Sequence, residues 1–250
     1  MPDFLLPDLP AEDILAAYAK APGSELEAGK LSSPESSAAL VANTFGFFLH
    51  RPRDLPPLPT LEDAGWPAEH VGIEECVRFP WSGGHHPWLD VLVETATHLI
   101  GIESKRYEPF RSHQEGGFSD AYRRPVWGRD MRPYEKMRDQ ILNKAISFQH
   151  LDAVQLVKHA FGLRTEGKRR GKAPVLFYLY ADPETWPDGR MIERKVREQH
   201  NVEINIFLSA LQGAEVKASA CSYGKLFEAL QLLGNNETAD HAKRVKQRYF

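Results

Sequence analysis

The stretch PWLDVLVETATHLIGIESK, Pro87 to Lys105, decides the fold of this chain. Two mostly apolar runs, 88–94 and 98–105, flank a break near Ala96, which predicts two antiparallel strands joined by a tight turn. A turn centred between Ala96 and Thr97 places Val91 opposite Ile102 and Asp90 opposite Glu103. A slip of one residue would move every apolar side chain to the other face, so the pattern favours this register.

Side chains alternate between the two faces of a strand. One face is therefore predicted to carry Leu89, Val91, Val93, Ile100 and Ile102, and the other Asp90, Glu103 and Lys105. Opposed Cβ atoms lie about 5 Å apart, where two carboxylates repel unless a positive charge lies between them. Oxygen ligands of this kind suit Mg²⁺ or Mn²⁺. The alternative is a solvated face on which Lys105 forms an ordinary surface ion pair.

Composition excludes several classes of protein. The chain has 250 residues, 42% of them apolar, and a formal net charge of −3, so any nucleic-acid surface must be local. Cys76 and Cys221 lie far apart, which argues against zinc and against a disulfide scaffold and fits a reducing cytoplasm. The N-terminus does not resemble a signal peptide. No apolar run approaches the ~18 residues of a membrane span, so no membrane partner is expected.

The remaining pattern predicts one α/β domain over residues 1–250, with helices on both faces of a mixed sheet. Helical patterns occur at 11–20, after Ser33-Pro34, and at 134–162, 186–199, 223–233 and 236–249. Further strand patterns occur at 72–79, 173–183, 202–211 and 214–222. Residues 106–133 have no clear period, which predicts a long loop of functional use.

The motif from Asp90 through Glu103 to Lys105, LD followed by twelve residues and then ESK, resembles the signature of the PD-(D/E)XK nuclease superfamily. SSPESSAALVANTFG and LDAVQLVKHAFGL resemble flanking helices of a poorly characterised bacterial branch of restriction-endonuclease-like proteins. The resemblance covers roughly residues 31–181. It implies a core in the order helix, three strands, helix, strand, with 182–250 packed onto it. Pro87 departs from the pattern, because it precedes Asp90 by three residues instead of adjoining it.

By this resemblance the chain would be a metal-dependent nuclease that hydrolyses phosphodiester bonds in DNA. Asp90, Glu103 and the backbone carbonyl of Ser104 would bind Mg²⁺, for which Mn²⁺ could substitute. Lys105 would position or activate the attacking water and steady the charge on the phosphate. Phosphodiester hydrolysis needs an activated water, a Lewis acid and charge neutralisation, which this set of residues could provide.

Two helices supply further candidates. In relatives an acid on the first core helix completes the metal shell, which implicates Glu35. Ser32 and Glu35 also fit a capping box, which explains the glutamate without a metal. On the later helix Asp152, Gln155, Lys158 and His159 form one polar stripe. The resemblance favours Gln155 and Lys158 near the active site, and the alternative is a solvated helix face.

Two basic segments could contact nucleic acid. GKRRGK, residues 167–172, reads as a basic loop with Arg169 and Arg170. A second segment contains Arg123 and Arg124 among other basic residues, with Tyr122, Trp127 and Tyr134 between them. Such segments can follow phosphates and stack on bases, although most are solvated surface.

Two other classes of protein stay open. A non-catalytic nucleic-acid-binding or scaffolding protein could use the same fold, because fold does not fix function. A glycosidase would need two carboxylates about 5 Å apart or more, and no lysine partner. A homodimer would allow both DNA strands to be cut, but the sequence contains no interface signature.

Overall fold

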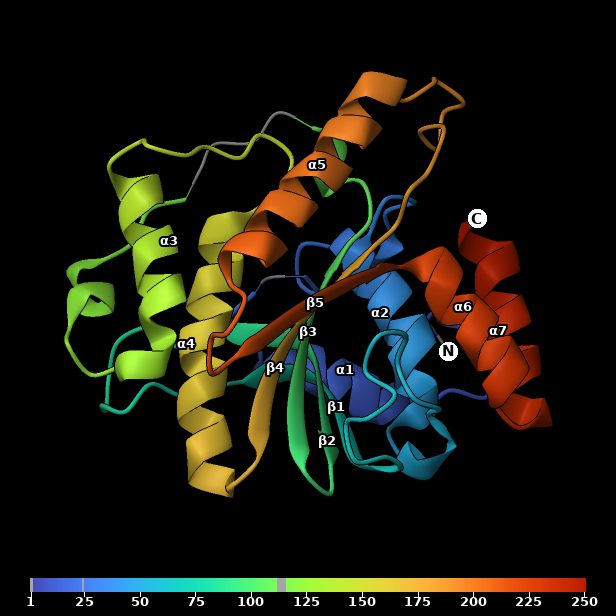
Figure 1. Ribbon diagram of the computed structural model, residues 1–250. Helices are drawn as coiled ribbons and strands as arrows, with labels where there is room; N and C mark the ends of the chain where they lie inside the picture. The colour runs from blue at the N-terminus through green and yellow to red at the C-terminus, as the bar shows by residue number, and fades with distance from the viewer. Residues whose placement is uncertain (1, 24, 112–115) are drawn as a thin grey trace.

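A single five-stranded sheet forms the centre of the computed structural model, which describes residues 2–23, 25–111 and 116–250 (Figure 1). The strands lie in chain order: β1 (Ala68–Cys76), β2 (Trp88–Thr95), β3 (His98–Lys105), β4 (Ala173–Tyr180) and β5 (Lys217–Ser222). β2 is antiparallel to both β1 and β3, whereas β3, β4 and β5 run parallel to one another. The prediction of an α/β fold with a mixed sheet is confirmed.

The register predicted for the β2–β3 hairpin is confirmed, because Val91 pairs with Ile102 and Val93 with Ile100. The face predicted for one side chain, that of Leu89, is wrong. Leu89 packs with Leu92 and Leu99, not with Val91. The strict alternation of faces breaks down between Leu89 and Val91, just beyond the paired stretch, where the backbone N–H of Ser104 donates to Asp90 Oδ2 over 2.6 Å.

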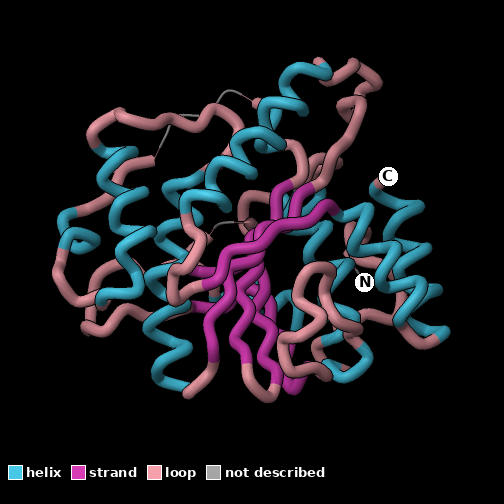
Figure 2. Tube along the Cα trace, viewed as in Figure 1, coloured by secondary structure: helices cyan, strands magenta, loops and turns pink. Residues whose placement is uncertain are grey.

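Helices cover both faces of the sheet, as the sequence predicted (Figure 2). One core contains residues of α1 (Ala11–Lys20), α2 (Ser37–Phe45), α6 (Tyr223–Leu233) and α7 (Asn236–Tyr249). The opposite core contains residues of α3 (Arg132–Leu142), α4 (Ala153–Arg170) and α5 (Arg194–Ala210). None of the described helices is long and apolar enough to cross a membrane.

The start of α2 differs from the prediction. Ser36 is the N-cap, and its Oγ accepts a hydrogen bond from the backbone N–H of Ala39 over 3.0 Å. Ser32 ends a preceding 3₁₀ turn, so Ser32 and Glu35 do not form the predicted capping box. Several serines in this segment could cap a helix, and the pattern alone did not distinguish between them. Glu35 therefore lies before the helix, not in its first turn.

Three other segments differ from the prediction. α5 begins at Arg194, so the helix predicted over 186–199 starts too early. α4 continues to Arg170, so Arg169 and Arg170 lie on a helix and not in a basic loop. Residues 202–211 belong almost entirely to α5, not to a strand. Ile204 and Phe207 are buried while Val202 and Ile206 are exposed, which is helical spacing.

The segment 106–133 contains short 3₁₀ turns at Glu108–Phe110, Asp120–Arg123 and Arg129–Met131. Between them, residues 112–115 of the predicted loop lie outside the described residues.

A buried carboxylate on α5 holds the chain immediately before α4. Glu203 accepts hydrogen bonds from the backbone N–H groups of Gln149, His150 and Leu151, at 2.8 to 3.0 Å. The next residue, Asp152, caps α4 by accepting from the N–H of Gln155 over 2.8 Å. These contacts fix where the first turns of α4 lie, and those turns face the end of β3.

We expect Glu203→Ala to lower the free energy of unfolding by about 3 kcal/mol, because it leaves three backbone donors without their acceptor. Urea denaturation measures the change. Glu198→Ala on the same helix is the matched control, since Glu198 is exposed and forms only a surface pair with Arg194. Its expected cost is below about 0.5 kcal/mol. Equal effects of the two substitutions would contradict this role of Glu203.

Candidate functional site

A cavity of about 500 Å³ lies where β1, β2 and β3 meet the start of α2 and the first turns of α4. It brings together residues that are far apart in the sequence. Six of the residues expected at the site line it, namely Glu35, Asp90, Glu103, Ser104, Lys105 and Gln155. Lys158, Arg123, Arg124, Arg169 and Arg170 do not.

Glu103 is the most enclosed of the acidic residues, with 1% of its surface exposed. Its Oε1 pairs with Lys105 Nζ. Its Oε2 lies 3.1 Å from His159 Nδ1, although neither atom makes a hydrogen bond of good geometry. Burial alone would raise the pKa of Glu103, but Lys105 and then His159 lower it below its usual range. Glu103 is therefore a buried carboxylate that remains ionised.

Lys105 is held on two sides. Its Nζ contacts Glu103 and donates to Gln155 Oε1 over 3.0 Å. Burial would lower the pKa of Lys105, but the charges of Glu103 and Asp90 outweigh burial and raise its pKa. The lysine is therefore a fixed cation inside the cavity. Gln155 belongs to the polar stripe of α4, and the stripe therefore reaches Lys105 at this position.

Asp90 lies at the end of the paired part of the hairpin. Burial raises its pKa, and the negative charges of Glu103 and Glu74 raise it further, against the effect of Lys105. The side chain of Ser104 points elsewhere, because its Oγ lies 2.7 Å from Tyr223 Oη. Only the backbone of Ser104 is therefore available to a ligand at this site.

Glu74 is a further acidic residue of the cavity that the sequence analysis missed. In the β1–β2 register it stands opposite Asp90, between the pairs Ile73–Val91 and Glu75–Leu89. Burial, followed by the charge of Glu103, raises its pKa to about 7. The acidic pair Glu74-Glu75, which follows the buried run Val71 to Ile73, was the available signal, but only the β1–β2 register identifies the partner of Glu74.

The cavity carries an excess of negative charge. Six carboxylate residues line it, Glu25, Glu35, Glu74, Asp90, Glu103 and Glu108, against three cationic ones, Lys30, Lys105 and Arg111. Glu35 is paired with Arg111. The raised pKa values of Asp90 and Glu74 are the expected result of buried acids with too few cations.

The donor set fits a magnesium-like ion. Among the described residues, no group of three or more His, Cys, Asp or Glu side chains is arranged to hold a metal ion. Mg²⁺ does not need such a group, since it keeps several waters and commonly binds through one or two carboxylates. Asp90 and Glu103 both line this cavity and are the two carboxylates that could hold such an ion.

The residues predicted to contact nucleic acid lie outside this cavity. Lys158 Nζ lies 5.8 Å from the ring centroids of both Phe118 and Tyr122. Arg169 pairs with Glu166, and Arg170 pairs with both Glu166 and Glu94.

Arg123 and Arg124 are exposed, and Arg124 lies over the ring of Trp81. The aromatic residues between the arginines, Tyr122, Trp127 and Tyr134, are buried in the core beneath α3 and α4. The prediction that they could stack on bases is wrong, because they pack inside the protein instead.

Comparison of the chain with protein-family models, with curated proteins and with solved structures finds no match.

We expect the stability of the metal-free protein to depend on Glu74. The pKa of Glu74 is about 7 in the folded protein, above its ordinary value of 4.5. Between those values the folded protein keeps a proton that the unfolded chain has released, so this residue lowers stability as the pH rises through that window. Glu74→Gln removes this effect, and should stabilise the protein by about 2 kcal/mol at about pH 8 and by little at about pH 5.

Urea denaturation in EDTA at both pH values measures this difference. Glu75→Gln, one residue along β1, is the matched control. A gain for Glu74→Gln that is the same at both pH values would contradict the assignment.

Proposed function

We propose that this protein is a metal-dependent nuclease with a restriction-endonuclease-like core, which hydrolyses phosphodiester bonds in DNA. The observation that carries the proposal is the convergence of Asp90, Glu103, Lys105 and Gln155 in one cavity. The order α2, β1, β2, β3, α4, β4 supports it, since this is the core order that the motif implies. α3 is an addition to that core, inserted between β3 and α4.

Asp90 and Glu103 would hold Mg²⁺ or Mn²⁺, together with the backbone carbonyl of Ser104. When bound, the ion would supply a Lewis acid at the phosphoryl oxygen and lower the pKa of a water. Glu35 could join the donor set if its pair with Arg111 opened. The surplus of carboxylates supports this role, because a cation in the cavity would offset the burial and the neighbouring negative charges that raise the pKa of Asp90.

Lys105 would stabilise the negative charge that develops on the phosphate during hydrolysis. Its raised pKa supports the role of a fixed cation and counts against that of a proton acceptor. Glu103 and Gln155 keep its ammonium group in place before the substrate arrives. Prior placement of this kind is what makes a charged group effective in the transition state.

The charge of the cavity also favours an enzyme over a non-catalytic nucleic-acid-binding protein. Nucleic-acid binding depends on basic side chains that neutralise phosphates, whereas this cavity has twice as many carboxylates as cationic groups. A phosphate would be repelled from it unless cations entered first. A requirement for divalent cations is expected of the nuclease and serves no purpose in simple binding.

Metal binding can be tested without a nuclease assay. Mg²⁺ or Mn²⁺ at about ten times its dissociation constant should raise the free energy of unfolding by about 1.4 kcal/mol. Asp90→Asn and Glu103→Gln should each remove most of this gain, which thermal unfolding with and without EDTA measures. Glu193→Gln, at an exposed position outside the cavity, is the control and should retain it. Equal stabilisation of all these variants would place the ion elsewhere.

Cleavage tests the proposal directly. Plasmid, linear and single-stranded DNA, with RNA of the same sequence, are incubated with Mg²⁺, Mn²⁺ or EDTA. Lys105→Ala should lower the cleavage rate at least about a hundredfold, and thermal unfolding verifies that the variant remains folded. Lys195→Ala removes an exposed lysine and should not change the rate. If the wild-type protein binds DNA but never cuts it with either metal, and Lys105→Ala binds equally well, the protein is a binding protein and not an enzyme.

A further inference from the structure

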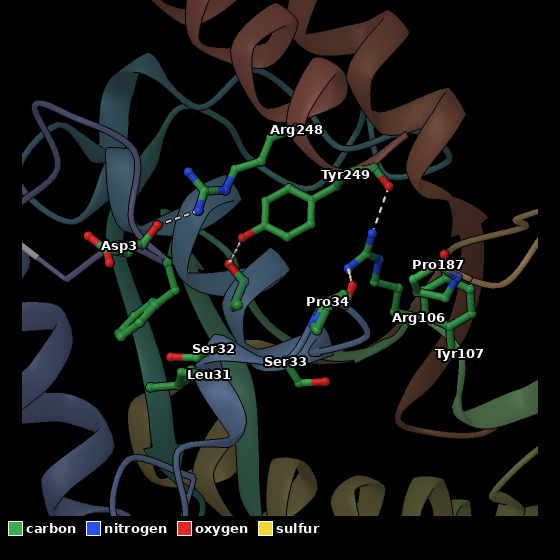
Figure 3. Close-up of a pocket in the computed structure, with 12 residues that line it drawn as sticks. Asp3, Leu31, Ser32, Ser33, Pro34, Arg106, Tyr107, Pro187, Arg248 and Tyr249 are labelled. Atoms are coloured by element: carbon green, nitrogen blue, oxygen red, sulfur yellow. Dashed lines mark hydrogen bonds between the residues drawn. The ribbon is translucent and has the colours of Figure 1, made fainter. Parts of the chain in front are cut away.

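A second cavity, of about 420 Å³, adjoins the candidate site (Figure 3). Ser33 and Tyr107 line both cavities, so these two residues form a shared wall. The remaining lining comes largely from the N-terminal segment, the turn before α2 and the end of α7. No residue of the proposed catalytic set lines this cavity.

The end of β3 supplies a cation to each cavity. Lys105 lines the first cavity and Arg106 the second, because consecutive residues of a strand point to opposite sides. Arg106 is 5% exposed. Its guanidinium group donates to the backbone carbonyls of Pro34 and Tyr249, and lies about 5 Å from the ring centroids of Tyr107 and Tyr249.

Arg106 lacks an acidic partner in the part of the chain that the structure describes. Among the described residues, no carboxylate lies within ion-pair distance of its guanidinium group. Burial lowers the pKa of Arg106, which is the expected effect of placing a cation in the interior without a counter-ion. Two backbone carbonyls satisfy some of its five N–H donors but supply no negative charge.

A second arginine reaches the same cavity from α7. Arg248 is exposed, and its guanidinium carbon lies 5.9 Å from the centroid of the Tyr249 ring. In Figure 3, Arg106 and Arg248 reach the cavity on either side of that ring. Arg248 donates to the backbone carbonyl of Asp3, and Asp3 is the single acidic residue in the described lining. The cavity therefore carries a net positive charge, opposite in sign to that of its neighbour.

We propose that the second cavity binds a phosphate of the nucleic-acid strand whose scissile phosphate enters the first. This inference rests on the proposed nuclease function. Guanidinium groups match the geometry of phosphate oxygens, and Arg106 and Arg248 present two of them. Because Ser33 and Tyr107 belong to both walls, a strand passing over them would place neighbouring phosphates in the two cavities. Two anchoring points would also fix the direction of the strand through the site.

The test is the affinity of fluorescently labelled single-stranded DNA for Arg248→Gln, measured in EDTA so that no strand is cut. We expect binding to weaken about tenfold at low salt, as for the removal of one hydrogen bond to a charged group. The slope of log K against log salt should fall by about 0.7, because the variant neutralises one phosphate fewer. Arg244→Gln is the matched control, because Arg244 lies on the same helix, pairs with Asp8 and lines neither cavity.

Strands with a 5′-phosphate and with a 5′-hydroxyl group identify which phosphate is bound. A weakening confined to the phosphorylated strand would assign the site to a terminal phosphate, and an equal weakening for both strands would assign it to an internal one. Thermal unfolding verifies that Arg248→Gln, a surface substitution, remains folded.

Equal binding by Arg248→Gln and Arg244→Gln would overturn the inference, even if the wild-type protein cuts DNA. A different outcome is weaker binding by Arg248→Gln alone, together with a wild-type protein that cuts neither DNA nor RNA. This outcome would support the phosphate site and refute the nuclease proposal.

Discussion

The buried carboxylate of Glu103 is the constraint on which the site depends. A charge removed from water is tolerated only when partners compensate for the missing hydration. Here Lys105 supplies the opposite charge and His159 closes the other side. Gln155 holds the lysine in turn. β3 and α4 must therefore keep their relative positions. The hydrogen bonds that Glu203 accepts from residues 149–151 help to hold the start of α4 in place.

The strand pairing next to the site could be predicted because it depends on side-chain alternation alone. Apolar residues at alternate positions fix the partner of Val91. The prediction failed at Leu89, beyond the last residue pair between β2 and β3, although β2 remains paired with β1 there. The prediction of a strand at residues 202–211 failed for a different reason. A short, strongly apolar run fits a strand or one face of a helix equally well.

The site itself was only partly predictable. The motif identified Asp90, Glu103 and Lys105, and the polar stripe identified Gln155. Glu74 was missed because it belongs to the site through the pairing of β1 with β2, which no local pattern reveals. The aromatic residues at 122, 127 and 134 were misjudged, since composition does not distinguish a stacking surface from a core. The cap of α2 was misplaced because neighbouring serines compete for the same role.

In the proposed nuclease, the two adjoining cavities would divide the handling of a nucleic acid between opposite charges. The first is acidic, so a phosphate can approach it only after cations have neutralised the surplus carboxylates. The second carries Arg106 and Arg248 and needs no metal to attract a phosphate. Because consecutive residues at the end of β3 supply the lysine of one cavity and the buried arginine of the other, the two sites are rigidly connected. Capture of a strand and its cleavage would then differ in their need for metal: the basic cavity could hold the strand without an ion, whereas hydrolysis would wait until the acidic cavity has taken up its cations.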